Sequence, residues 1–438
     1  MSGQALMARS RRRAERAGRA QHLGGRRAAR RLSAVLPALA GVVLLVAGCS
    51  GGSGTHAGGA APAGPAGTAG TAGTASSSAS ASQNMLRLVV PPGPVQNGNV
   101  IPQVDWVTPF QKQTGCQVYL KNANSDAQAV KDITTDGSYY SGVLASPEVA
   151  GQLISTKAVA PLNTALIPGF SSLAGALRTA PSGVAGGRTY AVPYAWDSYV
   201  TGYQPGTVKP APQDWSALFA PASAARYAGK ITMPDSVATI ALAALYLKSA
   251  QPSLGITDPF ELDQAQFAAA TQAVNAVRPN IGTFWSQDST VIGQLGDGQD
   301  VLGAVMTHQI GEMARAGLPA AGVQAQATAA RSGATIGYVQ SWLMSAHAGN
   351  KSCMYRWMSW TASKSVQERM AAWTGTAPVN PAACTGPAAA ICAAFHETTL
   401  SPAANLTFEH LPLAACGNGQ ANCVSYKHWQ SAWQKIIG

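Results

Sequence analysis

The folded part of this chain has to begin after Asn84, because the 35 residues from Ser50 to Asn84 consist almost entirely of Gly, Ala, Ser, Thr and Pro. These side chains cannot bury enough apolar surface to offset the entropy of an ordered backbone. The stretch therefore predicts a flexible tether, with a reach of roughly 30–35 Å. Any hydrophobic core must form within Met85–Gly438, a length typical of two lobes.

The start of the chain has the pattern of an export signal. Ten of its 30 Lys and Arg residues lie in Arg9–Arg31, and the apolar run Leu32–Ala47 follows directly. This run is shorter than the roughly 20 residues that span a bilayer, and it contains Pro and Gly. It predicts a secretory signal. The pairs Arg26-Arg27 and Arg30-Arg31 leave open whether export uses the general or the twin-arginine route.

The signal ends in the tetrapeptide Val46-Ala47-Gly48-Cys49, which resembles the lipobox of bacterial lipoproteins. The resemblance implies that residues 1–48 are removed, that the sulfur of Cys49 carries a lipid and that residues 49–84 tether the body to the membrane. The expected location is the outer face of the cytoplasmic membrane. A plain transmembrane anchor with an incidental cysteine is the alternative.

The formal net charge of +11 suggests a nucleic-acid partner until the charges are located. Outside Arg9–Arg31 the chain carries 20 basic and 18 acidic side chains, a net charge of +2. A nucleic-acid-binding domain needs Lys and Arg clustered on its folded surface. The nearly neutral body excludes this class of function.

Six cysteines follow the tether, an even number that favours disulfides in an exported protein. Cys384 with Cys392 and Cys416 with Cys423 would close short loops and are the preferred pairs, leaving Cys116 for Cys353. A metal site competes with this interpretation, but the spacings lack a paired CxxC pattern. We expect no metal and no cofactor.

Short strand-like runs alternate with helical ones along the body, a pattern that predicts an α/β fold. One helix is expected to open with a capping box at Ser365 and Glu368 and to end near Gly375. The predicted strands are Leu86–Val90, Cys116–Leu120, Tyr190–Pro193, Ile231–Met233 and Val301–Met306. The other predicted helices are Val104–Lys112, Asp126–Thr135, Val237–Ala250, Leu262–Val277 and Ser352–Trp360.

The stretch Gly187–Trp196 (GRTYAVPYAW), followed by Thr201-Gly202-Tyr203, resembles the first interlobe crossing of the spermidine/putrescine-binding proteins of ABC importers. Further elements of that family recur in the same order from Leu86 to Ala383. They are Phe110 with Thr114-Gly115, Asp214–Phe219, Leu295–Val301, Asn350–Trp360, Ser365–Glu368 and Gly375–Asn380. The stretch from Cys384 to Gly438 exceeds the family pattern and is not explained by it.

The resemblance implies a type II periplasmic-binding-protein fold, in which two α/β lobes joined by crossing strands hold a small solute and present it to a membrane permease. Closure needs only a few hinge residues to change conformation. The expected first lobe is 85–195 with about 307–342, and the second is about 196–306 with 343–438. We expect a monomer that performs no chemistry on its solute.

A polyamine site needs aromatic faces and carboxylates. Two or three acids that the family places in its site are missing here. The departures fall near Pro234 and Ala238, at Thr307-His308, where the family has a Trp and an acid, and in Tyr338–Ser341, where it has an aromatic residue followed by Asp. Asp197 is the candidate replacement or a loop cap, and Glu148 is interpreted as a solvated acid at a helix start. The candidate ligand-binding residues are Ser146, Tyr194, Trp196, Asp197, Asp235, Trp285, His308, Tyr338 and Trp342. For Trp285, Tyr338 and Trp342 core packing is the alternative.

Two other classes of function are alternatives to transport. A secreted enzyme would need a catalytic motif, but the chain has no GxSxG, HExxH or P-loop sequence, and only His308 among its histidines falls near the expected site. A lipoprotein that has lost transport and serves as a sensor or adhesion module is the other alternative, and the missing acids motivate it.

Overall fold

The computed structural model of this protein describes residues 84–323, 335–395, 406–413, 416 and 422–438. The predicted signal peptide, Cys49 and the tether lie outside these residues. Within the described ranges, every helix is too short or too polar to cross a membrane.

A mixed β-sheet runs through the body, with the strand order β2-β1-β3-β11-β6-β9-β7-β8. Short strands β10, β12 and β13 pair with its two long central strands. The strands are β1 (Met85–Val90), β2 (Gln117–Asn122), β3 (Gly142–Ala145), β6 (Ala191–Tyr203), β7 (Ile231–Pro234), β8 (Ile281–Trp285), β9 (Leu302–Met306), β10 (Ala321–Val323), β11 (Thr335–Met344), β12 (Ala377–Pro378) and β13 (Leu406–Phe408).

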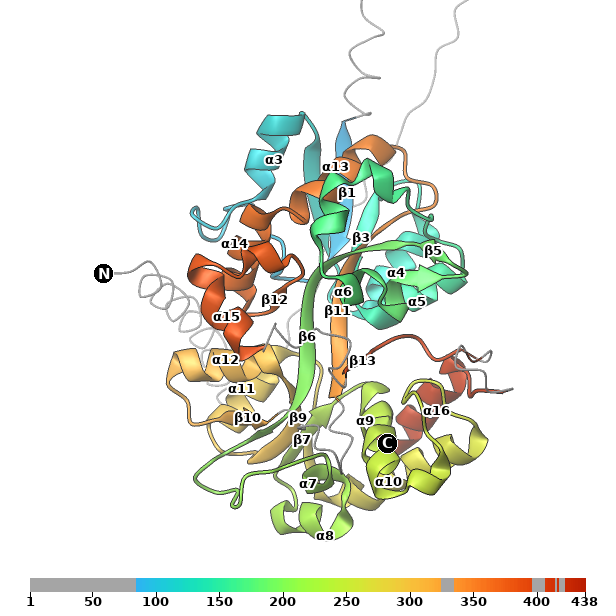
Figure 1. The fold of residues 1–438 in the computed structure, drawn as a ribbon, viewed down its shortest axis with the longest axis vertical. Helices are drawn as coiled ribbons and strands as arrows, with labels where there is room; N and C mark the ends of the chain where they lie inside the picture. The colour runs from blue at the N-terminus through green and yellow to red at the C-terminus, as the bar shows by residue number, and fades with distance from the viewer. Residues whose placement is uncertain (1–83, 324–334, 396–405, 414–415, 417–421) are drawn as a thin grey trace, which may run out of the picture. The chain divides into compact units, whose positions relative to one another are not determined.

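The strand directions divide the sheet into two parallel parts joined by antiparallel pairs. β1 pairs in parallel with β2 and β3, and β7 pairs in parallel with β8 and β9. Between them, β11 and β6 pair antiparallel with each other and with their outer neighbours β3 and β9. Figure 1 shows β6 and β11 side by side, passing from one part into the other. These are the crossing strands of the type II periplasmic-binding-protein fold.

Helices pack on both parts of the sheet, as parallel strands require. The first half, built on β1–β3, carries α3 (Val107–Thr114), α4 (Asp126–Thr135), α5 (Pro147–Ser155), α6 (Gly175–Arg178), α13 (Lys351–Thr361), α14 (Lys364–Thr374) and α15 (Ala389–Ala394). The second half, built on β7–β9, carries α7 (Ser216–Phe219), α8 (Pro221–Ala224), α9 (Ala238–Ala250), α10 (Gln264–Val277), α11 (Asp288–Gly296), α12 (Thr307–Ala316) and α16 (Tyr426–Ile437).

The two crossing strands contribute to separate hydrophobic cores. Ala191 of β6 and Leu343 of β11 pack into a core of the first half, whereas Tyr199 and Ile336, near the other ends of the same strands, pack into a core of the second half. Each half therefore buries apolar side chains of its own, and the backbone of two strands connects them. This arrangement lets each half stay rigid while the connection between them bends.

A β-bulge interrupts the pairing of the crossing strands in the VPY motif. Pro193 pairs with Ser341 and Ala195 with Gln340, so the intervening Tyr194 has no partner on β11. Proline has no N–H to donate and is tolerated at such irregularities. The bulge directs the carbonyl of Tyr194 to the side-chain amide of Gln367 in α14, at 2.8 Å.

The predicted strands and helices form, with bounds that differ by a few residues. Two details were wrong. The predicted strand Tyr190–Pro193 is the start of the much longer β6, because pairing with β11 continues the strand. The capping box at Ser365 does not form, since α14 begins after the N-cap residue Ser363, which makes no side-chain capping bond.

The lobe boundaries drawn from the sequence stay a prediction, but helices α12 to α15 pack differently from them, with α14 and α15 in the first half like α13. α12 packs against α11, β9 and β6 of the second half, and α13 packs against α3 and β1 of the first half. The sequence boundaries assign both helices to the opposite lobe. The reason is that β11, which carries the chain back into the first half, lies between these helices and was not recognised as a strand.

The disulfide pairing predicted from the sequence is confirmed. Cys384 bonds to Cys392 and Cys416 to Cys423. Cys116, just before β2, bonds to Cys353 of α13 across 237 residues of sequence. The six cysteines therefore form disulfides rather than a metal site.

Candidate functional site

Two helix N-termini bring a serine and two carboxylates together in the first half. Ser146 is the N-cap of α5 and accepts a hydrogen bond from the N–H of Val149. Its hydroxyl donates to a carboxylate oxygen of Asp126, the first residue of α4, at 2.6 Å. Glu148 lies in the first turn of α5. Acidic side chains are favoured at helix N-termini, where the backbone N–H groups carry partial positive charge.

The C-terminal part of the chain adds a tyrosine to this cluster. Tyr426, the first residue of α16, donates its hydroxyl to a carboxylate oxygen of Glu148 at 2.7 Å. The backbone N–H of Tyr426 donates to the carbonyl of Pro412. α16 itself packs on the second half through Trp429, Trp433 and Ile436. The hydrogen bond to Glu148 therefore joins the second half to the first.

A third carboxylate comes from Glu409, directly after β13. β13 pairs in parallel with β11, placing Phe408 beside Gly337, and the N–H of Glu409 donates to the Gly337 carbonyl at 2.8 Å. Glu409 is 4% exposed, and its Oε2 atom has no hydrogen-bond partner. A buried oxygen without a partner carries a free-energy cost.

Burial raises the pKa of all three carboxylates, and repulsion from neighbouring acids adds to this at Glu148 and Glu409. Burial is the main cause at Asp126, where the Ser146 hydrogen bond opposes it. Burial and the nearby Asp126 raise the pKa of Glu148 to about 7, although the Tyr426 hydrogen bond acts in the other direction. Burial, then Glu148 and Asp126, hold the pKa of Glu409 well above its usual range. No basic side chain of the described residues contributes to these shifts.

Two tyrosines of the crossing strands share this environment. Burial raises the pKa of Tyr338 on β11, and the charges of Asp126, Glu409 and Glu148 raise it further. Burial raises the pKa of Tyr199 on β6, with Glu409 as the largest charge effect. Ser146 and Tyr338, both expected from the sequence, thus lie with three acids at the junction of the two halves. We call Asp126, Glu148 and Glu409 the acidic cluster.

Comparison with known proteins decides the family. A profile of the bacterial extracellular solute-binding proteins matches residues 105–393, about two thirds of the chain. The chain belongs to this family.

Solved structures of other solute-binding proteins share its fold at low sequence identity. The spermidine/putrescine ABC transporter substrate-binding protein PotD of Streptococcus pneumoniae is 15% identical, with a TM-score of 0.59 over 81% of this chain and 97% of that one. The Tp0655 lipoprotein of Treponema pallidum is 14% identical, with a TM-score of 0.59 over 80% and 99%. MotA of A. tumefaciens B6, in complex with glucopine, is 12% identical, with a TM-score of 0.58 over 80% and 99%. The type II fold expected from the sequence is confirmed.

Three aromatic residues expected in the binding site are buried in the first half of this solute-binding protein. Tyr194, Trp196 and Trp342 are each at most 2% exposed. Tyr194 and Trp342 pack edge to face with ring centroids 5.6 Å apart, and Trp196 packs on Phe395 at 5.2 Å. The Tyr194 hydroxyl donates to the Pro94 carbonyl. Their contacts are those of core residues, and a role in ligand binding stays a prediction.

Asp197 and His308 form a buried pair of their own. Nδ1 of His308, the second residue of α12, lies 2.5 Å from Asp197 Oδ2, and its Nε2 lies 3.1 Å from Asp288 of α11. Asp197 also accepts the N–H groups of Ser198 and Thr307. Burial acts to lower the pKa of His308, but Asp197 and Asp288 outweigh it and raise that pKa well above 6.5. These contacts already use both carboxylate oxygens of Asp197, and its expected role in ligand binding stays a prediction.

The remaining expected residues, Asp235 and Trp285, lie at the ends of β7 and β8. Trp285 donates its indole N–H to the Ala304 carbonyl at 3.0 Å and is 8% exposed. Asp235 accepts the indole N–H of Trp433 at 3.0 Å. The first bond joins β8 to β9, and the second joins α16 to the end of β7.

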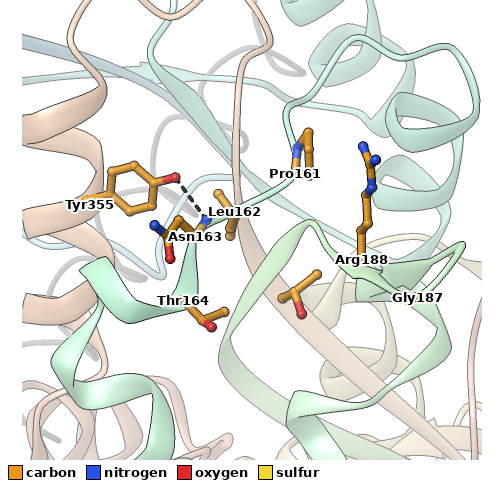
Figure 2. A pocket seen from close by; sticks show the side chains of 8 residues that line it. Pro161, Leu162, Asn163, Thr164, Gly187, Arg188 and Tyr355 are labelled. Carbon is orange, nitrogen blue, oxygen red and sulfur yellow. Dashed lines mark hydrogen bonds between the residues drawn. The ribbon is translucent and has the colours of Figure 1, made fainter.

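A surface hollow of the first half lies apart from the acidic cluster. Figure 2 shows Tyr355 of α13 and Arg188 of β5 (Arg188–Thr189) on opposite sides of it, with Asn163 between them. The Asn163 N–H donates to the Tyr355 hydroxyl at 3.1 Å. The hollow is lined by Pro161, Leu162, Asn163, Thr164, Gly187, Arg188, Thr189 and Tyr355. It contains none of the candidate ligand-binding residues predicted from the sequence.

Sequence reasoning missed Asp126, Glu409 and Tyr426 and gave Glu148 a different role. A signal existed for the first half, because Asp126 and Ser146 each follow a strand of one parallel sheet. The carboxyl ends of such strands meet at one edge, where ligands of α/β proteins bind. Glu409 and Tyr426 carried no comparable signal, since their positions depend on β13 pairing with a strand about 70 residues earlier.

Proposed function

We propose that this protein is the substrate-binding lipoprotein of an ABC importer and that it holds a small organic cation at the junction of its two halves. The acidic cluster supports the cationic ligand more than any other observation. Three carboxylates from separate elements converge there, and the described residues supply no counter-charge.

The energetics of the acidic cluster favour a cation. Burial disfavours the charged form of each carboxylate, and repulsion between neighbouring acids adds to this at Glu148 and Glu409. An ammonium group between them replaces repulsion by attraction and provides donors for the unpartnered oxygen of Glu409. Tyr199 and Tyr338 add aromatic surface, which attracts cations and packs on methylene chains.

Spermidine, putrescine and related amines are the proposed ligands. The PotD protein is a spermidine/putrescine substrate-binding protein, whereas the MotA structure contains glucopine, so the fold accommodates different solutes. The proposal of an amine ligand therefore rests on the three acids and not on the fold. A sensor or accessory lipoprotein that binds the same cations without transport is the second candidate, because its site would need the same charges.

The remaining parts of the proposal rest on the sequence. Cys49 would carry the lipid and residues 49–84 would tether a monomeric body near a membrane permease. The Treponema structure with the same fold is a lipoprotein. No chemistry on the solute is part of the proposal, and His308 is held between two carboxylates.

Thermal unfolding of the exported, purified protein tests this function. Spermidine or putrescine at a hundredfold excess over its dissociation constant should stabilise the fold by about 2.7 kcal/mol, and maltose at the same concentration should not. A rise in melting temperature with sugars but with no amine would refute the cationic ligand. A co-purifying permease would favour the importer, and a co-purifying sensor kinase the second candidate.

A further inference from the structure

The C-terminal segment, residues 406–438, lies beyond the part of the chain that matches the family, yet its described residues contact both halves. On one side, Leu411 packs so closely on Gly151 of α5 that a Cβ at Gly151 would overlap its side chain. On the other side, His410 packs on Phe260 with ring centroids 5.2 Å apart. Residues 409–412 are buried between the halves.

Further along the C-terminal segment, strand pairing, a backbone hydrogen bond and aromatic packing hold it against the rest of the body. β13 extends the sheet beside β11, and the N–H of Val424 donates to the carbonyl of Leu262 at 2.8 Å. α16 buries Trp429 against Phe260 and Phe267. The positions of Glu409 and Tyr426 are thus set by packing on both sides of them. A buried carboxyl group held in this way, with one oxygen left without a partner, can accept a hydrogen bond from a group that arrives from outside.

We infer that the C-terminal segment completes the solute site, with Glu409 pairing a second ammonium group of a dication and Tyr426 positioning Glu148. This inference rests on the proposed function and adds to it the C-terminal residues that would bind the second ammonium group of a diamine. Asp126 and Glu148 of the first half offer one anionic position, which Ser146 and Tyr426 orient. Glu409 offers another, from a different element. A monoamine would leave Glu409 unpaired, whereas a diamine neutralises both positions.

Titration calorimetry with two matched ligands tests the role of Glu409. Putrescine and n-butylamine share a four-carbon chain and differ by one ammonium group. The Glu409→Gln variant should lose putrescine affinity by roughly 30-fold or more, because a buried charge pair loses one partner. Its affinity for n-butylamine should change by less than about threefold.

Asp300→Asn is the matched control. Asp300 is 2% exposed, has an unpartnered Oδ2 atom and has a pKa raised by burial, but it lies outside the acidic cluster. This variant should bind putrescine like the unaltered protein. Equal putrescine affinity of Glu409→Gln and the unaltered protein would overturn the inference while leaving the proposed function intact. If the unaltered protein binds neither amine, the proposed function fails, and this inference fails with it.

The Tyr426→Phe variant tests the positioning role through its pH profile. The titratable groups around Glu148 are Asp126 from α4, Glu409, Tyr426, and the two tyrosines of the crossing strands. Because the Tyr426 hydroxyl acts to lower the pKa of Glu148, its removal should move the pH midpoint of putrescine binding upward. An unchanged midpoint would exclude this role, and Phe at position 426 keeps the ring packing so that folding is preserved.

Discussion

His308, a candidate ligand-binding residue from the sequence, makes contacts that join three elements of the fold. Its imidazole lies between Asp197, which is 2% exposed, and the more exposed Asp288. The two acids hold its pKa well above 6.5 against the opposing effect of burial. The charged imidazole thus joins the starts of α11 and α12 to β6, on the side of the second half where β6 pairs with β9.

Removal of this imidazole should destabilise the protein in a pH-dependent way. His308→Gln should lower the free energy of unfolding by about 3–5 kcal/mol near pH 6, because Asp197 is left buried without its cation. The contribution of His308 is fully present below pH 6.5, the usual histidine pKa, and is lost as the pH rises through the raised pKa. Urea unfolding of both proteins across pH 5–9 measures the difference.

Glu148 also makes the unaltered protein lose stability with rising pH, since its pKa is raised from 4.5 to about 7. The difference between the two proteins removes this contribution, because both contain Glu148. A difference that is constant with pH would show that folding does not raise the pKa of His308.

At the scale of elements, β13 determines whether the acidic cluster is complete. It has only three residues, and Gly337 of β11 allows it to approach closely. A Cβ at Gly337 would lie 2.8 Å from the ring of Phe408 and would overlap Leu406. Backbone pairing of β13 with β11 then places Glu409 directly beyond the last paired residue.

Gly337→Ala should therefore weaken both the fold and cation binding. We expect a loss of about 1–3 kcal/mol of stability, because the added methyl group overpacks the contact with β13. Putrescine affinity should fall as Glu409 is displaced. Gly206→Ala is the control, since nothing lies within 4 Å of its Cβ position. If calorimetry shows unchanged putrescine affinity in the Gly337→Ala variant, the position of β13 does not determine cation binding.

Prediction from sequence succeeded best at this scale where the signal was local. α4 was predicted with its observed bounds, Asp126–Thr135, because a polar cap precedes an amphipathic run. β11 was not among the predicted strands, because Gly337 interrupts its run of strand-forming residues. Its strand conformation depends on pairing with β3 and β6. Ser146 and Tyr338 were found through family resemblance, whereas Glu409 has no counterpart in that pattern.

At the scale of the whole molecule, one disulfide closes a long loop within the first half. Cys116–Cys353 joins the start of β2 to α13, and the stretch between them, a sequence separation of 237 residues, includes β7–β9 and α7–α12 of the second half. The bond restricts the unfolded chain far more than Cys416–Cys423, which spans 7 residues. Loop-closure entropy predicts a difference of about 3 kcal/mol between the two bonds.

Paired cysteine substitutions should show this difference. The Cys116→Ala/Cys353→Ala variant should lower the free energy of unfolding by about 2–5 kcal/mol, and the Cys416→Ala/Cys423→Ala variant by less. Calorimetric melting of both variants gives the comparison. Equal losses would mean that strain or structure in the unfolded chain, rather than loop length, determines the effect.

Sequence alone indicated the family and the fold class of this protein, and it favoured the disulfide pairs that form without determining them. These follow from local patterns: periodic apolar residues, an ordered set of short motifs and cysteines that close short loops. Tertiary structure alone decided which acids meet. Asp126, Glu148 and Glu409 lie far apart in the chain, and their repulsion opposes their approach, so only the packing of α4, α5 and β13 brings them together.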